Sequence, residues 1–247
     1  MNRDPANQEQ CYEAVKTKDG SLTFYNQEYG QHYHNQEGAL SEAQHVFLNA
    51  FQKESGHWPK NLAVLDVGFG LGLNSFVFLN QFFELPLAQD WHWQFHCLEK
   101  DPAVLKIKAS DDDLKIPGMT IGEQAFKALS CLRQELHYSF AQGGKTLVCD
   151  LHLGDAKVVL EKMATQQTQI NLILHDPFSP KVNPECWQSD FFRMLSKVCA
   201  PGAMLLTYSV ARVVKDALSA AGFRVFKRPG FGKKRERLVA IWEGNNS

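Results

Sequence analysis

The sequence contains no apolar run of eighteen or more residues, the length that a helix needs to cross a membrane. The segment from Met1 to Gln8 is polar and has no apolar stretch typical of a secretion signal. The six cysteines are scattered and form no C-x-x-C pair, which favours reduced and mostly buried thiols. These absences predict a cytoplasmic protein that makes no contact with a membrane.

A metal site is also missing from the pattern. His32 and His34 alternate as residues of a strand do, but no cysteine or carboxylate stands at a spacing that would complete a set of ligands. We therefore expect a protein without a metal ion.

Charge is nearly balanced over the whole chain, with a net value of −1, but it is unevenly distributed. From residue 211 to the C-terminus there are nine Lys and Arg residues and three acidic residues, which gives +6 and leaves −7 for the first 210 residues. This asymmetry allows a localised surface for nucleic acid on an otherwise acidic protein. Charge alone leaves a second interpretation open, in which the basic segment is only a solvated edge.

The segment from Val64 to Asn74 has the composition of a buried strand, a glycine turn and the start of a helix. Gly68, Gly70 and Gly72 occupy every second position, and glycine lets the backbone take positive φ angles and approach a ligand closely. The spacing G-x-G-x-G differs from the G-x-G-x-x-G of dinucleotide sites. It favours S-adenosylmethionine (SAM) over NAD, although a tight turn without a ligand has the same pattern.

Acidic residues follow two further strand candidates. Residues 93–98 are expected to form a strand that leads into Glu99, where a carboxylate can accept hydrogen bonds from both ribose hydroxyls of a cofactor. Residues 147–153 form another strand, and Asp155 after it suits the exocyclic amine of adenine. For Glu99, a helix-capping role is the alternative.

The segment with the most candidate chemistry follows the strand expected at residues 170–174. Asp176 opens a loop in which Pro177 and Pro180 exclude continued regular structure, so the loop is stiff and lies at the carboxyl edge of the sheet. A lone aspartate in a loop is commonly a turn residue. Its place directly after an apolar strand, with Phe178 beside it, favours a catalytic role for Asp176.

The remaining segments complete an α/β sheet. Three further strands and two helices are expected, at residues 203–208, 223–226, 238–242, 183–198 and 213–221. Residues 103–145 are expected to be mainly helical, with polar interruptions such as Gln142 to Gly144. The order of elements predicts the Rossmann-like, seven-stranded fold of SAM-dependent methyltransferases.

A small β/α extension precedes this sheet. Lys18 to Ser21 has the composition of a hairpin turn between two short strands, and residues 39–51 have helical spacing. At 247 residues, of which 44% are apolar, the chain is long enough for one sizeable core and short for two. We therefore expect an extension at residues 1–60, packed on a methyltransferase domain at residues 61–247.

Four passages make the chain resemble the methyltransferase domains of the MnmC family of tRNA-modifying proteins, and more closely the stand-alone members of that family. They are residues 33–42, 67–74, 176–187 and 227–236. The third and fourth are specific, because general methyltransferases do not share them. Pro177 departs from the family pattern, which usually has Ala or Gly after the aspartate.

The resemblance implies methyl transfer from SAM to the aminomethyl nitrogen of 5-aminomethyl-2-thiouridine at the tRNA wobble position. The partner is then the anticodon region of tRNA. An alkyl amine is mostly protonated at neutral pH, so it must lose a proton before its lone pair attacks the methyl group. The carboxylate of Asp176 suits the task of orienting the ammonium and receiving that proton.

The predicted site takes its other residues from the same passages and from the strand ends. SAM is expected to contact Asp66, Gly68, Phe69, Gly70, Gly72, Asn74, Glu99, Asp155, Ala156 and Glu42. The substrate is expected to contact Phe178, Lys181, Lys233, Lys234 and Arg235. Phe178 would stack on the flipped base, and the basic residues would hold backbone phosphates.

Other functions fit part of the pattern. A methyltransferase or a polyamine-type aminopropyltransferase acting on a small amine would use a similar sheet, but the aminopropyltransferases normally have a second acid in the catalytic loop, where this chain has only Asp176. A non-catalytic RNA-binding module would keep the basic segment. It has no need for Glu99, Asp155 and Asp176 together at successive strand ends.

Overall fold

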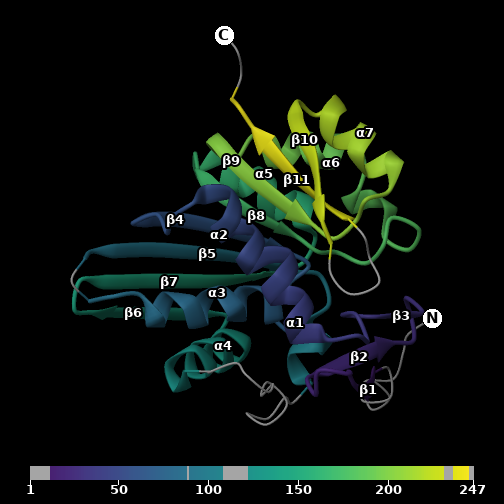
Figure 1. Ribbon diagram of the computed structural model, residues 1–247. Coiled ribbons are helices and arrows are strands. Elements are labelled where there is room, and N and C mark those ends of the chain that lie inside the picture. The colour runs from purple at the N-terminus through teal and green to yellow at the C-terminus, as the bar shows by residue number, and fades with distance from the viewer. Residues whose placement is uncertain (1–11, 88, 108–121, 231–235, 245–247) are drawn as a thin grey trace.

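The computed structural model describes residues 12–87, 89–107, 122–230 and 236–244. Within them, the chain forms an eight-stranded sheet and a separate three-stranded sheet, which lies near the carboxyl ends of the parallel strands of the large sheet (Figure 1). None of the helices in this described part combines the length and apolar character that a membrane crossing requires.

The large sheet has the order β10-β11-β9-β8-β4-β5-β7-β6. Its parallel strands are β4 (Asn61–Val67), β5 (Trp91–Glu99), β7 (Lys145–Leu153), β8 (Ile170–His175) and β9 (Cys199–Thr207). Its antiparallel strands are β6 (His137–Gln142), β10 (Phe223–Pro229) and β11 (Glu236–Trp242). The strand order reverses between β4 and β8, which is where ligands bind in open α/β sheets. The predicted Rossmann-like fold class is confirmed.

The sheet has one strand more than the seven that were expected. Residues 103–145 were predicted to be mainly helical, but His137 to Gln142 form β6, which pairs with β7 through a two-residue turn. Gly143 and Gly144 both have positive φ angles, of 60° and 80°, as the tight turn of such a hairpin requires. The prediction was wrong here because this Gly-Gly pair was interpreted as an interruption between helices.

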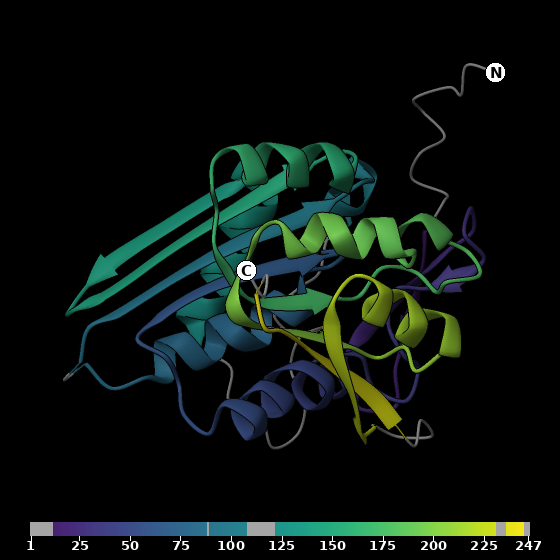
Figure 2. The same ribbon diagram turned by 90° about the horizontal axis from the view of Figure 1, so that it is seen from above.

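Helices cover both faces of the sheet (Figures 1 and 2). One face packs against α3 (Leu73–Glu84) and α4 (Glu123–Glu135), and the other against α5 (Ala156–Thr165), α6 (Ser189–Ser196) and α7 (Arg212–Ala220). Alternate residues of one strand enter different cores: Leu172 and Leu174 of β8 lie in the first, and Ile173 lies in the second. This alternation explains why residues 172–174 are all apolar.

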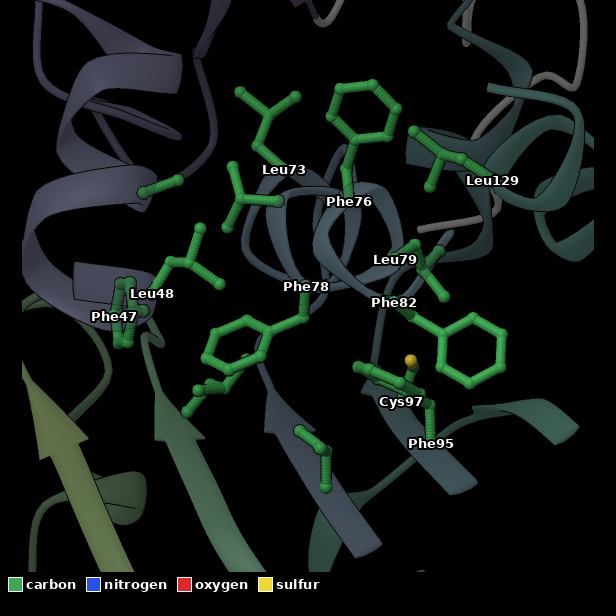
Figure 3. Packing of buried hydrophobic residues seen from close by; sticks show 14 of the residues in the cluster. Phe47, Leu48, Leu73, Phe76, Phe78, Leu79, Phe82, Phe95, Cys97 and Leu129 are labelled. Carbon is green, nitrogen blue, oxygen red and sulfur yellow. The ribbon is translucent and has the colours of Figure 1, made fainter. Parts of the chain in front are cut away.

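Helix α3 is the centre of the first core, because nearly every side chain on it is buried. Figure 3 shows Phe76, Phe78 and Phe82 of this helix surrounded by side chains from η2 (Gln44–Leu48), α4 and β5. Burying a phenylalanine contributes roughly 1.5–3 kcal/mol, so α3 is strongly anchored. The glycine turn that begins at Gly68 leads directly into this helix, and therefore rests on a rigid base.

The N-terminal extension contains the three-stranded sheet and a helical segment. Strands β1 (Tyr12–Lys16) and β2 (Leu22–Asn26) form the predicted hairpin, and β3 (Gln31–His32) pairs with β2. The predicted helix runs from Ala39 to Ser55 as α1 (Ala39–Ala43), a π-helical stretch η2 (Gln44–Leu48) and α2 (Asn49–Ser55). Side chains of both parts, including Phe24 and Phe47, enter the first core.

Two short 3₁₀ helices lie in the segments that follow the carboxyl ends of β5 and β8. The first, η3 (Pro102–Lys106), starts at a proline after β5, as expected. The second, η5 (Pro184–Cys186), takes part of the segment that was predicted to be one helix at residues 183–198. The α-helix in that segment begins only at Ser189, because Trp187 and Gln188 have non-helical backbone angles.

Candidate active site

A pocket of about 710 Å³ lies at the carboxyl ends of the parallel strands. Gly68 follows β4, Glu99 ends β5, Asp155 follows β7 and Asp176 follows β8, and all four line it. Residues 29–37 and Glu42 of the N-terminal extension also line the pocket. The extension therefore completes a site that the sheet alone would leave open.

The backbone of the glycine turn is bonded to the neighbouring strand. The N–H groups of Gly68 and Phe69 both donate to the carbonyl of Leu98, at 3.1 and 2.9 Å. The N–H of Gly70 donates to Oε2 of Glu99 at 2.7 Å. The end of β5 thus fixes the turn through both its backbone and its side chain.

Each glycine of the turn is also required by a contact within the protein. A methyl group on Gly68 would lie 2.9 Å from the Asp176 carbonyl oxygen and from Pro177 Cα, and one on Gly70 would lie 3.0 Å from the ring of Tyr33. All three glycines have φ angles between 55° and 85°. The turn is therefore packed closely against the loop that follows β8 (residues 176–183) and against the N-terminal extension.

Glu99 is 8% exposed, and both of its carboxylate oxygens accept hydrogen bonds from backbone N–H groups. Oε2 accepts from Gly70, and Oε1 accepts from the N–H of Asp101 at 2.8 Å. Burial raises the pKa of Glu99, while the two backbone donors act in the opposite direction. A carboxylate oxygen accepts more than one hydrogen bond, so Glu99 keeps the capacity to accept from ribose hydroxyls. Capping of a helix, the alternative considered from the sequence, is done here by Asp101.

Asp155 is exposed and caps α5, where it accepts from the N–H of Lys157 at 2.8 Å. Ala156, the first residue of that helix, lies beside it in the pocket wall. The positive end of the α5 dipole therefore meets the pocket next to Asp155.

Asp176 is held by the glycine turn and the helix after it. Its N–H donates to the carbonyl of Val67 at 3.0 Å, and its Oδ2 accepts from Nδ2 of Asn74 at 2.7 Å. Pro177 is buried, and its carbonyl accepts from the hydroxyl of Tyr208 at 3.1 Å. Burial and the charges of Asp176 and Glu42 raise the pKa of Tyr208, so its hydroxyl remains a donor.

The other side of this loop packs against the N-terminal extension. The ring of Phe178 stacks on Tyr29, with centroids 4.8 Å apart, and is tilted against Tyr33 at 5.0 Å. Gln31 donates to the hydroxyl of Ser179 at 2.6 Å and accepts from its N–H at 3.2 Å. The pocket wall near Asp176 is thus aromatic and is built from two distant parts of the chain.

Sequence reasoning missed Tyr29, Gln31, Tyr33 and Tyr208, all of which line the pocket. Tyr33 is the first residue of a passage shared with the family and Tyr29 lies four residues before it, and this proximity was the one available signal. Gln31 and Tyr208 gave none, because their roles depend on which segments the fold brings together.

Several of the predicted contact residues do not line the pocket. Asp66 is fully buried and accepts from the hydroxyl of Ser75 at 2.6 Å. Burial raises the pKa of Asp66 to about 7. Phe69 packs under Gly72, and Asn74 contacts Asp176. Lys181 is exposed outside the pocket, while Lys233, Lys234 and Arg235 lie outside the described residues.

The charge of the pocket is strongly negative. Among the described residues that line it are seven Asp or Glu side chains and two lysines, Lys100 and Lys157. Within the residues that the structure describes, no cluster of three or more His, Cys, Asp or Glu side chains is arranged to bind a metal ion. The pocket suits ligands that carry positive charge, such as a sulfonium or an ammonium group.

Several cations of the basic C-terminal segment are paired. Lys227 pairs with Glu236 at 2.7 Å and Arg224 with Glu243 at 3.0 Å, both on the surface. Arg228 forms two hydrogen bonds to Glu54 of α2, at 2.6 and 3.0 Å. These pairs brace the closing strands, so a smaller positive charge is left on the described part of the segment than its composition suggests.

Comparison with known proteins agrees with this geometry. A family model described as S-adenosyl-L-methionine-dependent methyltransferase matches residues 121–243. The chain belongs to this methyltransferase family. Its cofactor is therefore SAM, and the acidic pocket beside the glycine turn fits a cofactor that carries a sulfonium.

The methyltransferase is 34% identical, over 243 residues, to the tRNA 5-methylaminomethyl-2-thiouridine biosynthesis bifunctional protein MnmC of Cupriavidus metallidurans. That match covers 94% of this chain and 34% of the relative. The chain thus spans about one third of the length of the curated relatives that it matches.

Two solved structures resemble the fold. MNMC2 from Aquifex aeolicus is 26% identical with a TM-score of 0.71, over 94% of this chain and 71% of that one. A protein described as a probable spermidine synthase from Corynebacterium glutamicum has a TM-score of 0.50 and 16% identity, over 94% of this chain and 75% of that one. The second likeness shows the fold alone.

Proposed function

We propose that this methyltransferase converts 5-aminomethyl-2-thiouridine to 5-methylaminomethyl-2-thiouridine at the wobble position of tRNA. The observation that carries the proposal is the placement of Asp176, whose carboxylate lines an acidic pocket directly beside the glycine turn. The name of the Cupriavidus relative, which describes biosynthesis of the same nucleoside, supports the choice of substrate.

Residues at the strand ends would hold the cofactor. Gly68 and Gly70 line the pocket with backbone alone, Glu99 would accept from the ribose hydroxyls, and Asp155 would accept from the adenine amine. Glu42, which is 9% exposed and accepts from the N–H of Asn35 at 3.1 Å, lines the same pocket. When bound, SAM supplies a methyl group on a positively charged sulfur.

Asp176 would act on the acceptor amine. Its carboxylate would orient the ammonium form of the aminomethyl group and receive one of its protons, so that the nitrogen lone pair is free to take the methyl group. The bond from that methyl carbon to the sulfonium sulfur would break and leave a neutral thioether. The rigid backbone around Pro177 keeps the carboxylate in place during this transfer. The negative charge of the pocket favours entry of a protonated amine over entry of a neutral or acidic substrate group.

The tRNA would be bound through its anticodon region, in the cytoplasm. The aromatic wall formed by Phe178, Tyr29 and Tyr33 offers stacking surfaces for a flipped uridine. Because Tyr29 covers one face of Phe178, the base would stack at the edge of this cluster or displace Tyr29. Lys233, Lys234 and Arg235 would contact backbone phosphates.

The proposal is tested by incubating the protein with methyl-labelled SAM and tRNA that lacks the wobble methyl group, followed by digestion to nucleosides. We expect label in 5-methylaminomethyl-2-thiouridine and none with tRNA that already carries the methyl group. Label transferred to free amines but not to tRNA would favour a small-molecule methyltransferase. Absence of any transfer, with tRNA still bound, would favour an RNA-binding module.

A further inference from the structure

Asn74 is the second residue of α3 and is 2% exposed. Its Nδ2 lies 2.7 Å from Oδ2 of Asp176, although the two residues are 102 positions apart in the chain. From the sequence it was assigned to the cofactor, but it does not line the pocket. We propose that Asn74 is a positioning residue, which orients the carboxylate of Asp176 for methyl transfer. This inference rests on the proposed function.

The position of Asn74 in the fold holds its side-chain amide in one place. It follows the glycine turn, and Asp176 is contacted on the other side of that turn by the carbonyl of Val67 at the end of β4 and by the close approach of Gly68. Helix α3 is buried on nearly all sides, so the amide has little freedom to move. A hydrogen bond from such an anchor fixes the orientation of the carboxylate.

The identity of the residue supports the same conclusion. The other buried positions of α3 are mostly apolar, and burying an amide is unfavourable unless it is hydrogen-bonded. Asparagine is also a weaker helix former than leucine or alanine. A polar residue at this position has a clear physical purpose only through the group that it contacts, and that group is Asp176.

The chemical consequence follows from the donor. The NH₂ of an amide donates at every pH, and a donated hydrogen bond stabilises the ionised form of a carboxylate. Other titratable groups around Asp176 include Glu42 from α1, Glu99 from β5 and Tyr208 after β9, which line the same pocket, and the buried His175 precedes it. Two of these are acids that disfavour a further negative charge, so a dedicated donor counteracts them.

Two variants test the inference, each checked for folding by circular dichroism. Asn74→Ala removes the donor, and the isosteric Asn74→Asp replaces it with a second carboxylate. We expect Asn74→Ala to lower the single-turnover methyl-transfer rate at neutral pH by about 10- to 100-fold and to leave SAM affinity within about twofold. The acid limb of the pH–rate profile should move to higher pH in Asn74→Ala, and further in Asn74→Asp.

Asn80→Ala is the matched control. Asn80 lies on the same helix, is 9% exposed and accepts from the N–H of Gly122 at 2.8 Å, far along the helix from Asp176. We expect this variant to change stability without moving the pH–rate profile. A shift in Asn80→Ala equal to that in Asn74→Ala would overturn the inference, since the effect would then be a general loss of packing.

A measurement without substrate separates this inference from the proposed function. The carboxyl ¹³C resonance of Asp176, assigned with the Asp176→Asn variant, is titrated in the wild-type protein and in Asn74→Ala. A midpoint raised by about one pH unit in Asn74→Ala supports the inference, whatever the acceptor of the methyl group is. An unchanged midpoint, or a loss of SAM affinity with an unchanged pH–rate profile, would show that Asn74 serves the cofactor or the fold instead.

Discussion

A methyl group added to Gly68 would lie 2.9 Å from Cα of Pro177, so the glycine turn and the loop that carries Asp176 touch through their backbones. From the sequence, the glycines of the turn were explained by a ligand that approaches the backbone closely. The structure adds a second reason, since a side chain at Gly68 would push the loop that carries Asp176.

This contact predicts that Gly68→Ala is more harmful than backbone strain alone. Gly202 has nearly the same φ angle, 80° against 85°, but nothing lies within 4 Å of a methyl group placed on it. We expect Gly202→Ala to lower the unfolding free energy by about 1–2 kcal/mol, and Gly68→Ala by roughly 2–4 kcal/mol with a loss of methyl transfer. Equal losses in chemical denaturation would show that the contact with Pro177 is unimportant.

Glu99 carries the second prediction. Its carboxylate holds Gly70 and Asp101 and would also bind the ribose, so Glu99→Ala should weaken SAM binding by something like 1–3 kcal/mol in calorimetry. Glu161→Ala, which removes an exposed carboxylate from α5, is the control and should bind SAM normally. Wild-type affinity in Glu99→Ala would refute the assignment.

Asp66 predicts a pH-dependent stability. Burial raises its pKa from 3.8 to about 7, so the folded state favours the protonated form. The stability that this group contributes is full below about pH 4 and is lost as pH rises towards 7. The unfolding free energy of the wild type should therefore fall relative to that of Asp66→Asn by roughly 3–4 kcal/mol as the pH rises from about 4 to about 7. The measurement is the unfolding free energy of both proteins from chemical denaturation at several pH values in this range. The same pH dependence in both proteins would contradict the prediction.

The basic segment gives a prediction about tRNA. Replacing Lys233, Lys234 and Arg235 with alanine should raise the KM for tRNA and flatten its salt dependence, without changing SAM affinity. The control is a triple substitution of exposed lysines on α4, on α5 and directly after α6, namely Lys127, Lys162 and Lys197. If both triple variants show the wild-type salt slope, the segment is only a solvated edge.

Much of the fold followed from local patterns. The parallel strands, the glycine turn and the positions of Glu99 and Asp176 at strand ends were predicted because apolar runs and turn residues are visible within short windows. Strand β6 was missed, although Tyr138 and Phe140 alternate with exposed residues, because the Gly-Gly pair after it was interpreted as an interruption between helices. Only its pairing with β7 makes it a strand.

The site was less predictable, because long-range packing decides which residues meet. Asp66 and Asn74 belong to the glycine segment and were assigned to the cofactor with it, but one faces Ser75 and the other Asp176. The pairing of Gln31 with Ser179 joins segments 148 positions apart. No spacing rule within the sequence reports such a contact.

The most direct test of the account is the single-turnover rate of Asp176→Asn with SAM and tRNA that lacks the wobble methyl group. The substitution keeps the shape of the side chain and removes its charge, so folding and binding should be preserved. We predict a rate about 10²–10⁴-fold lower at neutral pH that recovers at high pH, where the amine is already deprotonated. A well-folded variant that binds both ligands and loses less than about tenfold would contradict the role of Asp176 as proton acceptor.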